Sequence, residues 1–165
     1  MTDITLKVED GYFIYGVSAI ILHNNNVLMA KNDNYPYYYP IGGRVSFGET
    51  SENAVLREVH EETGVDFEID RLAFIHENFF VGSFMGNKPC HEIRLFYLMK
   101  PHNDVENIKC SNVDVNGEKE SLHWLPIDKL SEYHLFPEFF KSELRCLKNE
   151  VGHFITKGGN TVRVK

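Results

Sequence analysis

The 165-residue sequence has few cysteines, no long apolar run and no excess of basic residues. Its three cysteines (Cys90, Cys110 and Cys146) are odd in number and form no C-x-x-C pair, which argues against a disulfide framework and a cysteine zinc site. No apolar run approaches the roughly 20 residues of a membrane span. The first residues lack the basic start and apolar core of a secretory signal. These absences predict a cytoplasmic protein with reduced thiols and no membrane partner.

The formal net charge of −7 argues against binding of polymeric nucleic acid, which requires neutralisation of many phosphates. It does not exclude a small phosphorylated substrate, because a bound divalent cation can invert the local sign of the charge. The composition is 42% hydrophobic and 25% charged, as in ordinary globular proteins. The length predicts one domain over residues 1–165, with a loose tail from about residue 157, where Lys157-Gly158-Gly159-Asn160 occurs.

The most informative segment is residues 43–65. It contains Gly43, then Glu49 after five residues, then after seven more the run Arg57-Glu58-Val59-His60-Glu61-Glu62-Thr63-Gly64-Val65. Thr50 or Ser51 can cap the N-terminus of a helix, and Gly64 can end it in the left-handed conformation. The segment therefore predicts a glycine loop that leads into a short helix.

Glu58, Glu61 and Glu62 have the i, i+3 and i+4 spacing that places three carboxylates on one helix face. Such like charges repel each other, and hard oxygen donors suit Mg²⁺ or Mn²⁺ together with a substrate phosphate. The alternative is a solvated acidic face with an internal Arg57–Glu61 ion pair, which three glutamates alone would favour. The whole pattern, however, is expected by chance in on the order of 10⁻⁷ of chains of this length. It therefore favours a functional site.

This pattern resembles, at every defining position, the signature of the Nudix hydrolases, which cut nucleoside diphosphates linked to another moiety. The resemblance implies an α/β fold, an α/β/α sandwich with a central mixed β-sheet, and a hydrolase that depends on Mg²⁺ or Mn²⁺. The implied metal ligands are Glu58, Glu61, Glu62 and the backbone carbonyl of Gly42. Arg57 and Glu49 resemble the ion pair that orients the helix, and either Glu58 or Glu61 is the general base.

In the family, an acidic residue a few positions before a tryptophan often completes the metal site. Glu118 and Glu120 precede Trp124 in this way, and we take Glu118 as the metal-site candidate with Glu120 as the alternative. A plain surface glutamate is an equally good interpretation, because the register of the strand cannot be determined from the sequence.

The remaining periodicity predicts a mostly β chain around this helix. Residues 101–117 are polar and predict a loop. Expected strands are 3–9, 12–23, 27–30, 66–81, 90–100, 120–125 and an edge strand at 151–155. Expected helices are 126–132 and an amphipathic helix over 136–147.

Candidate substrate residues lie in two regions. Tyr39 belongs to an aromatic segment that either plugs the end of the fold or forms a platform for a nucleobase. Phe79, Phe80 and Arg94 belong to a predicted hairpin that could line a pocket, although a lone arginine is more often structural. Arg44 could contact a phosphate, although a solvated arginine is the simpler interpretation.

The resemblance leaves the substrate open. ADP-ribose-cleaving relatives tend to carry a proline where this chain has Phe80, which argues against that subclass. A nucleoside triphosphate or a nucleotide sugar remains, so the expected partner is a small nucleoside diphosphate derivative. A nucleotide sensor without catalysis is the alternative, but such proteins usually lose signature glutamates that are complete here. Homodimers are common in the family, so a homodimer is also expected, although no interface can be identified from the sequence.

Overall fold

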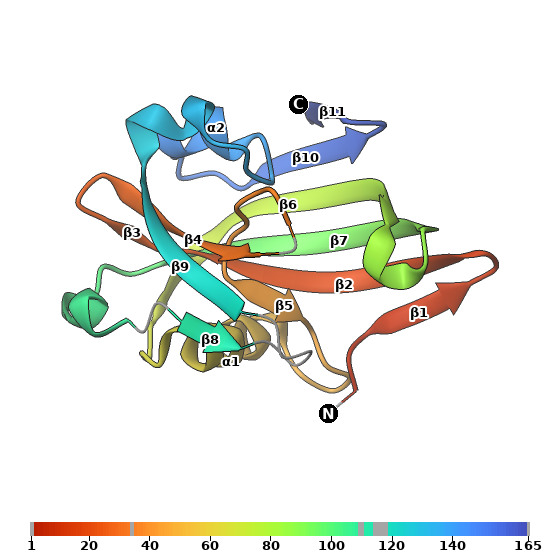
Figure 1. Ribbon diagram of the computed structural model, residues 1–165, viewed down its shortest axis with the longest axis horizontal. Helices are drawn as coiled ribbons and strands as arrows, with labels where there is room; N and C mark the ends of the chain where they lie inside the picture. The colour runs from red at the N-terminus through yellow and green to blue at the C-terminus, as the bar shows by residue number, and fades with distance from the viewer. Residues whose placement is uncertain (1, 34, 109–110, 114–118, 165) are drawn as a thin grey trace.

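The computed structural model describes residues 2–33, 35–108, 111–113 and 119–164, and its strands form two sheets (Figure 1). The strands of the larger sheet are β1 (Thr5–Val8), β2 (Gly11–Ile20), β5 (Gly42–Arg44), β6 (Ile69–Gly82), β7 (Lys88–Met99), β10 (Gly152–Lys157) and β11 (Asn160–Arg163). Their order is β1-β2-β7-β6-β10-β11, with β5 paired to β2. The sheet is mixed, because β2–β7 and β6–β10 are parallel pairs and the others are antiparallel.

The smaller sheet has four strands in the order β3-β4-β9-β8. They are β3 (Leu22–His23), β4 (Asn26–Asn32), β8 (Ser111–Val113) and β9 (Lys119–Pro126). The turn between β3 and β4 consists of Asn24 and Asn25, which both have positive φ, as the tight turn of a two-residue hairpin requires. This hairpin joins the predicted strands 12–23 and 27–30.

The predicted helix is α1 (Ser51–Thr63). The Thr50 hydroxyl accepts a hydrogen bond from the backbone N–H of Asn53 at 3.2 Å, and so satisfies one of the free donors at the helix start. Gly64 ends the helix with a φ of 73°, and its N–H donates to the carbonyl oxygen of His60. Both predicted ends of the helix are therefore confirmed.

Alternate residues of the central strands face opposite sides of the larger sheet. In β2, Val17 and Ala19 pack in the core that contains the buried α1 side chains, whereas Ile20 packs in a second core. Three short helices cover the second core: η3 (Ile127–Glu132), α2 (Phe140–Glu143) and η4 (Leu144–Cys146). Figure 1 shows α1 and these helices on opposite faces of the sheet, which confirms the predicted α/β/α sandwich with a central mixed sheet.

The predicted amphipathic helix over residues 136–147 is wrong in length, because only α2 and η4 are helical. The segment begins as tight turns, in which the N–H groups of Phe140 and Lys141 donate to the carbonyls of Pro137 and Glu138, three residues back. Phe139 and Phe140 are adjacent, yet both are buried in the second core. Tertiary packing of the two rings therefore overrides the helical pattern.

Two further predictions need correction. Residues 101–117, predicted as a loop, include η2 (Asn103–Asn107) and β8 in their described part. The predicted edge strand at 151–155 is β10, which lies between β6 and β11.

Residues 157–164 do not form a loose tail, because Asn160–Arg163 form β11. Gly158 and Gly159 both have positive φ and make a two-residue turn between β10 and β11. What looked like a flexible glycine segment is therefore a hairpin turn.

No helix in the described residues is long and apolar enough to cross a membrane. Cys90 is a buried free thiol and Cys146 an exposed one, and Cys110 lies outside the described residues.

Candidate active site

The glycine pair at the start of β5 brings this strand into close contact with α1. Gly42 has a φ of 149°, and a Cβ at this position would lie 2.2 Å from the carbonyl oxygen of Val17. A Cβ at Gly43 would lie 2.3 Å from Oε1 of Glu58. Because glycine has no Cβ, the backbone can pass this close to both groups. The Glu58 carboxylate is thereby packed against β5.

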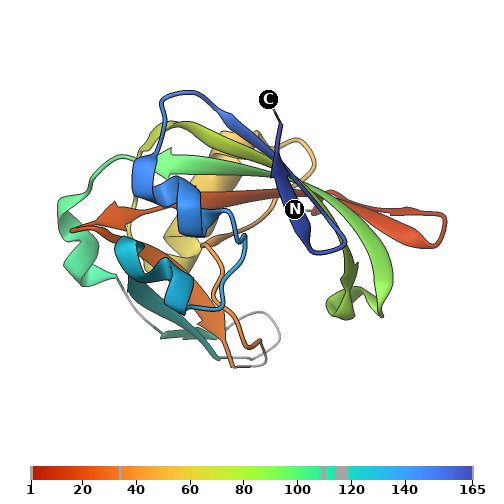
Figure 2. The same cartoon turned by 90° about the horizontal axis from the view of Figure 1, so that it is seen from above.

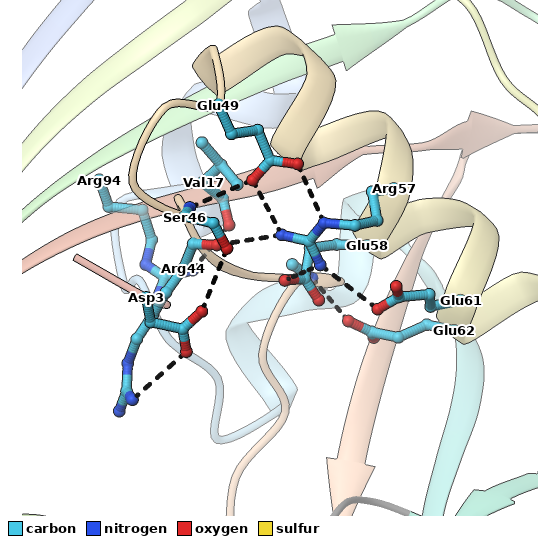
Figure 3. Close-up of polar contacts among 11 residues, drawn as sticks. Asp3, Val17, Arg44, Ser46, Glu49, Arg57, Glu58, Glu61, Glu62 and Arg94 are labelled. Atoms are coloured by element: carbon cyan, nitrogen blue, oxygen red, sulfur yellow. Dashed lines mark hydrogen bonds and ion pairs between the residues drawn. The ribbon is translucent and has the colours of Figure 1, made fainter. Parts of the chain in front are cut away.

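The Arg57 guanidinium joins the preceding loop to the helix (Figure 3). Its Nε and Nη2 donate to the two carboxylate oxygens of Glu49 at 3.0 and 3.2 Å, the two-point geometry that makes such pairs strong. Nη2 also donates to the carbonyl oxygen of Arg44 at 3.2 Å. Glu49 accepts a further bond from the Ser46 N–H, and the hydrogen bonds from Arg57 lower the pKa of the Glu49 carboxyl. The expected ion pair is present, and its orienting role stays a prediction.

Glu58 and Glu61 both accept hydrogen bonds from Nη1 of Arg57, at 2.8 and 3.3 Å. Their surroundings differ, because the Glu58 side chain is 17% exposed and the Glu61 side chain is 57% exposed. Burial raises the pKa of Glu58, although the neighbouring Arg57 opposes that shift. The Arg57–Glu61 pair of the alternative interpretation exists, but this acidic face is not uniformly solvated.

Glu62 is the most buried of the three signature glutamates and faces a carboxylate from the other sheet. Its Oε1 accepts a hydrogen bond from the Gly42 N–H at 3.0 Å. Burial raises the pKa of Glu62 well above its ordinary range, and the charge of Glu120 on β9 raises it further. The Tyr39 hydroxyl donates to Oε1 of Glu120 at 2.5 Å. Glu118 lies outside the described residues, whereas its alternative, Glu120, lies beside Glu62.

These carboxylates suit a divalent cation, although the described side chains contain no ready-made cage of three or more His, Cys, Asp or Glu residues. Mg²⁺ does not need such a cage, since it commonly binds one or two carboxylates and takes its other ligands from water and substrate phosphate. The close approach of Glu62 and Glu120 is unfavourable while both are ionised, and a cation between them would offset that repulsion. The donor set present therefore fits Mg²⁺ or Mn²⁺.

A cleft of about 1500 Å³ opens over the face of the larger sheet that carries the second core. Figure 2 shows the β1–β2 and β6–β7 hairpins projecting together from the body of the molecule, and Leu6, Val8 and Val81 of these hairpins line the cleft. Tyr39 and Gly42 also line it. Because these two residues hydrogen-bond to Glu120 and Glu62, the cleft leads directly to the carboxylates.

A model of the NUDIX domain matches residues 13–145, which is most of the chain. The chain belongs to the Nudix family. It is 30% identical over 118 residues to a MutT-like protein of Streptomyces ambofaciens, an alignment that covers 70% of this chain and 66% of that protein. It is 37% identical over 65 residues to an ADP-ribose pyrophosphatase of Methanocaldococcus jannaschii, with 38% of each chain covered. The chain thus spans less than two thirds of the length of either relative.

The crystal structure of a MutT protein from Bacillus halodurans has the same fold. Its TM-score to this chain is 0.67 at 19% sequence identity, with 88% of this chain and 91% of that chain covered. This likeness supports the Nudix fold alone.

The predicted substrate residues of this Nudix domain do not all lie together. Tyr39, Phe79, Phe80 and Arg94 line the cleft. Arg44 is not among the lining residues, and its Nη1 lies 3.8 Å from Oδ2 of Asp3.

The predicted β6–β7 pairing is confirmed, with Phe79 opposite His91 and Phe80 opposite Cys90. Neighbouring residues of a strand point to opposite faces, although Phe79 and Phe80 both line the cleft. The Phe79 ring stacks on His91 with centroids 4.2 Å apart.

Of the other residues that line the cleft, Phe136 is not indicated by the sequence. Tyr37 and Phe136 make an edge-to-face contact with ring centroids 5.1 Å apart, which brings together two segments distant in sequence. Glu92 and Asn78 lie opposite each other on β7 and β6 and both line the cleft. Both residues belong to the predicted hairpin that could line a pocket.

Proposed function

We propose that this Nudix protein is a hydrolase that cleaves the diphosphate linkage of a nucleoside diphosphate joined to another moiety. One observation carries the proposal. Two residues that line an aromatic cleft, Gly42 and Tyr39, hydrogen-bond to the carboxylates of Glu62 and Glu120. A substrate held in the cleft would thus present its phosphates to the acidic side of α1.

The protein's own residues have distinct parts in this mechanism. Arg57 fixes Glu49, Glu58 and Glu61 relative to one another. The Gly42 N–H orients Glu62, the Tyr39 hydroxyl orients Glu120, and the charges of the two carboxylates act on each other.

We further propose that Glu58, Glu61, Glu62, Glu120 and the Gly42 carbonyl hold Mg²⁺ or Mn²⁺. When bound, the cation would neutralise charge on the diphosphate and acidify the attacking water. Either Glu58 or Glu61 would accept the proton of that water as general base. Of these two, Glu58 is packed against β5 and Glu61 is exposed to solvent.

The cleft supports a substrate with two parts. Its volume of about 1500 Å³ exceeds the roughly 300–1,000 Å³ of typical small-molecule sites. A nucleotide sugar or another nucleotide with a second moiety would use this space better than a nucleotide alone, although a nucleoside triphosphate also remains a candidate.

The net charge of −7 favours a small nucleotide over polymeric nucleic acid. A cytoplasmic location and a homodimer stay predictions.

The test is release of phosphate or of a nucleoside monophosphate from a panel of nucleoside triphosphates, nucleotide sugars, ADP-ribose and dinucleoside polyphosphates. The full chain is assayed with Mg²⁺, with Mn²⁺ and with excess EDTA. We expect cleavage of one substrate class that requires the divalent cation. If no member of the panel is cleaved while a nucleotide still raises the melting temperature, the protein is a nucleotide sensor and the proposal is wrong.

A further inference from the structure

The floor of the cleft contains a fixed acidic group that the proposed mechanism does not use. Glu92 lies on β7, and the residue is only 8% exposed. Its Oε1 accepts two hydrogen bonds from Arg94, from Nε at 3.0 Å and from Nη2 at 2.7 Å. A Cβ at Gly16 on β2 would lie 3.0 Å from this oxygen and 2.9 Å from Cζ of Arg94, so the pair occupies the space left by a missing side chain.

Arg94 holds Glu92 rather than reaching towards a phosphate. Its Nη1 donates to the Val17 carbonyl oxygen at 2.9 Å and to the Ser18 hydroxyl at 2.8 Å. Together with the two bonds to Glu92, these contacts occupy four of the five donors that an arginine carries. Arg94 is therefore a positioning residue, and its charge offsets the charge of Glu92.

The second oxygen of Glu92, Oε2, receives no hydrogen bond from any residue in the described part of the chain. Oε2 is not one of the fully buried polar atoms that lack a partner, so it is open to the cleft and suited to a ligand that brings N–H groups. Asn78 lies directly opposite Glu92 in the β6–β7 pair and lines the same cleft. Directly opposed residues have Cβ atoms roughly 5 Å apart, so one planar ligand can contact both side chains.

Aromatic side chains line the same cleft as Glu92 and Asn78. Tyr35, Tyr37, Tyr39 and Phe136 line the cleft, and neighbouring rings in this set have centroids 5.1 to 6.3 Å apart. An acceptor floor with aromatic walls is the arrangement by which proteins hold an unstacked base, with ring faces stacked and one edge hydrogen-bonded.

We propose that Glu92 determines the base specificity of the cleft and selects a guanine nucleotide. Guanine carries two neighbouring donors on one edge, N1–H and N2–H₂, next to the O6 acceptor. Glu92 Oε2 would accept from these donors, and the Asn78 carboxamide would donate to O6. Uracil presents an N–H flanked by two carbonyl acceptors, which the carboxylate repels. This inference rests on the proposed function, because it names the base of the substrate bound in the same cleft.

The experiment is calorimetric titration of the full chain with GMP, IMP and UMP in the absence of divalent cations. IMP differs from GMP by the missing 2-amino group alone. We expect wild type to bind GMP about 10-fold or more tighter than UMP, with IMP between them. In Glu92→Gln, the amide oxygen can still accept from Arg94, so the fold is retained. The amide NH₂ then faces the base donors, and the GMP-to-UMP affinity ratio falls towards one.

Glu138→Gln is the matched control, because Glu138 also lines the cleft and loses the same charge. We expect Glu138→Gln to keep the wild-type ratio, which separates base recognition from a general effect of charge on anionic ligands. Equal binding of GMP and UMP by wild type would overturn the inference even if Glu92→Gln did not fold. An unchanged ratio in a folded Glu92→Gln would also overturn it. Neither result would affect the proposed hydrolysis, which fails only if the substrate panel is not cleaved.

Discussion

The carboxylate site on α1 and the cleft beside it are built in opposite ways. The site derives mainly from one continuous segment, in which Arg57 holds Glu49, Glu58 and Glu61 through short local contacts. The cleft is assembled from β1, β2, β6, β7, the aromatic segment near Tyr39 and the turn near Phe136. This difference predicts that the catalytic step and the choice of substrate depend on different residues. Substitutions in the segment should affect all substrates alike, and substitutions in the cleft should change which substrate is preferred.

The largest loss of activity is expected on substitution of Glu62. Glu62→Gln should lower turnover about 100-fold or more for every substrate. It should not lower the melting temperature, because it removes a buried charge beside Glu120. Steady-state kinetics and thermal unfolding measure both effects. Glu61→Gln should behave similarly, and Glu52→Gln, an exposed charge removal on the same helix, should retain wild-type kinetics. Near-normal turnover in both Glu61→Gln and Glu62→Gln at saturating Mg²⁺ would contradict the assignment.

The second largest effect is expected from the ion pair between Arg57 and Glu49, which joins the loop to the helix. Arg57→Gln removes the partner of the buried Glu49 carboxylate, and we expect a loss of about 2 kcal/mol in unfolding free energy together with a roughly 10- to 100-fold loss of activity. Arg57→Lys keeps the charge but not the two-point contact, so it should restore part of the stability and little of the activity. Urea unfolding and kinetics of the two variants distinguish these effects. Full activity in Arg57→Gln would show that the pair has no orienting role.

A separate pH effect on stability should arise in the cleft face, at His76. Burial lowers the pKa of His76 to about 4, with Arg94 and His153 acting in the same direction and Glu92 opposing. The unfolded chain, with an ordinary His pKa of about 6.5, therefore binds the proton more readily. This contribution to stability is complete above pH 6.5 and is lost as the pH falls towards 4, by up to about 3 kcal/mol.

His76→Gln can keep a hydrogen bond to the Thr156 hydroxyl, which lies 2.8 Å from Nε2, and it removes the titration. Its unfolding free energy should therefore fall less than that of wild type between pH 6.5 and 4. Parallel pH profiles for the two proteins would refute this account of His76.

The smallest effect on activity is expected from the aromatic side chains that line the cleft. Phe136→Ala removes the edge-to-face partner of Tyr37 at a half-exposed position, so the fold should be little affected. We expect KM for the preferred nucleotide to rise several-fold with little change in kcat, in contrast to Glu62→Gln. A fall in kcat without a change in KM would place Phe136 with the chemistry and weaken the separation of the two regions.

The same contrast explains what could be predicted from the sequence. The helix, its caps at Thr50 and Gly64 and its acidic face depend on neighbours within a few residues, so spacing alone indicates them. The proximity of Glu120 to Glu62 depends on how β9 pairs with β4, and the opposition of Glu92 and Asn78 depends on the register of β6 with β7. Register is a property of two strands, and a single strand does not contain it. The length of the helix after Pro137 cannot be predicted for a similar reason, because two adjacent phenylalanines are buried in a core that other segments form.

The central claim, that the α1 carboxylates bind a divalent cation, is tested most directly by Mn²⁺ titration monitored by electron paramagnetic resonance without substrate. Wild type and Glu52→Gln should bind Mn²⁺ with equal affinity, and Glu62→Gln should bind it about 10-fold or more weakly. Equal Mn²⁺ affinity in wild type and Glu62→Gln would contradict the claim.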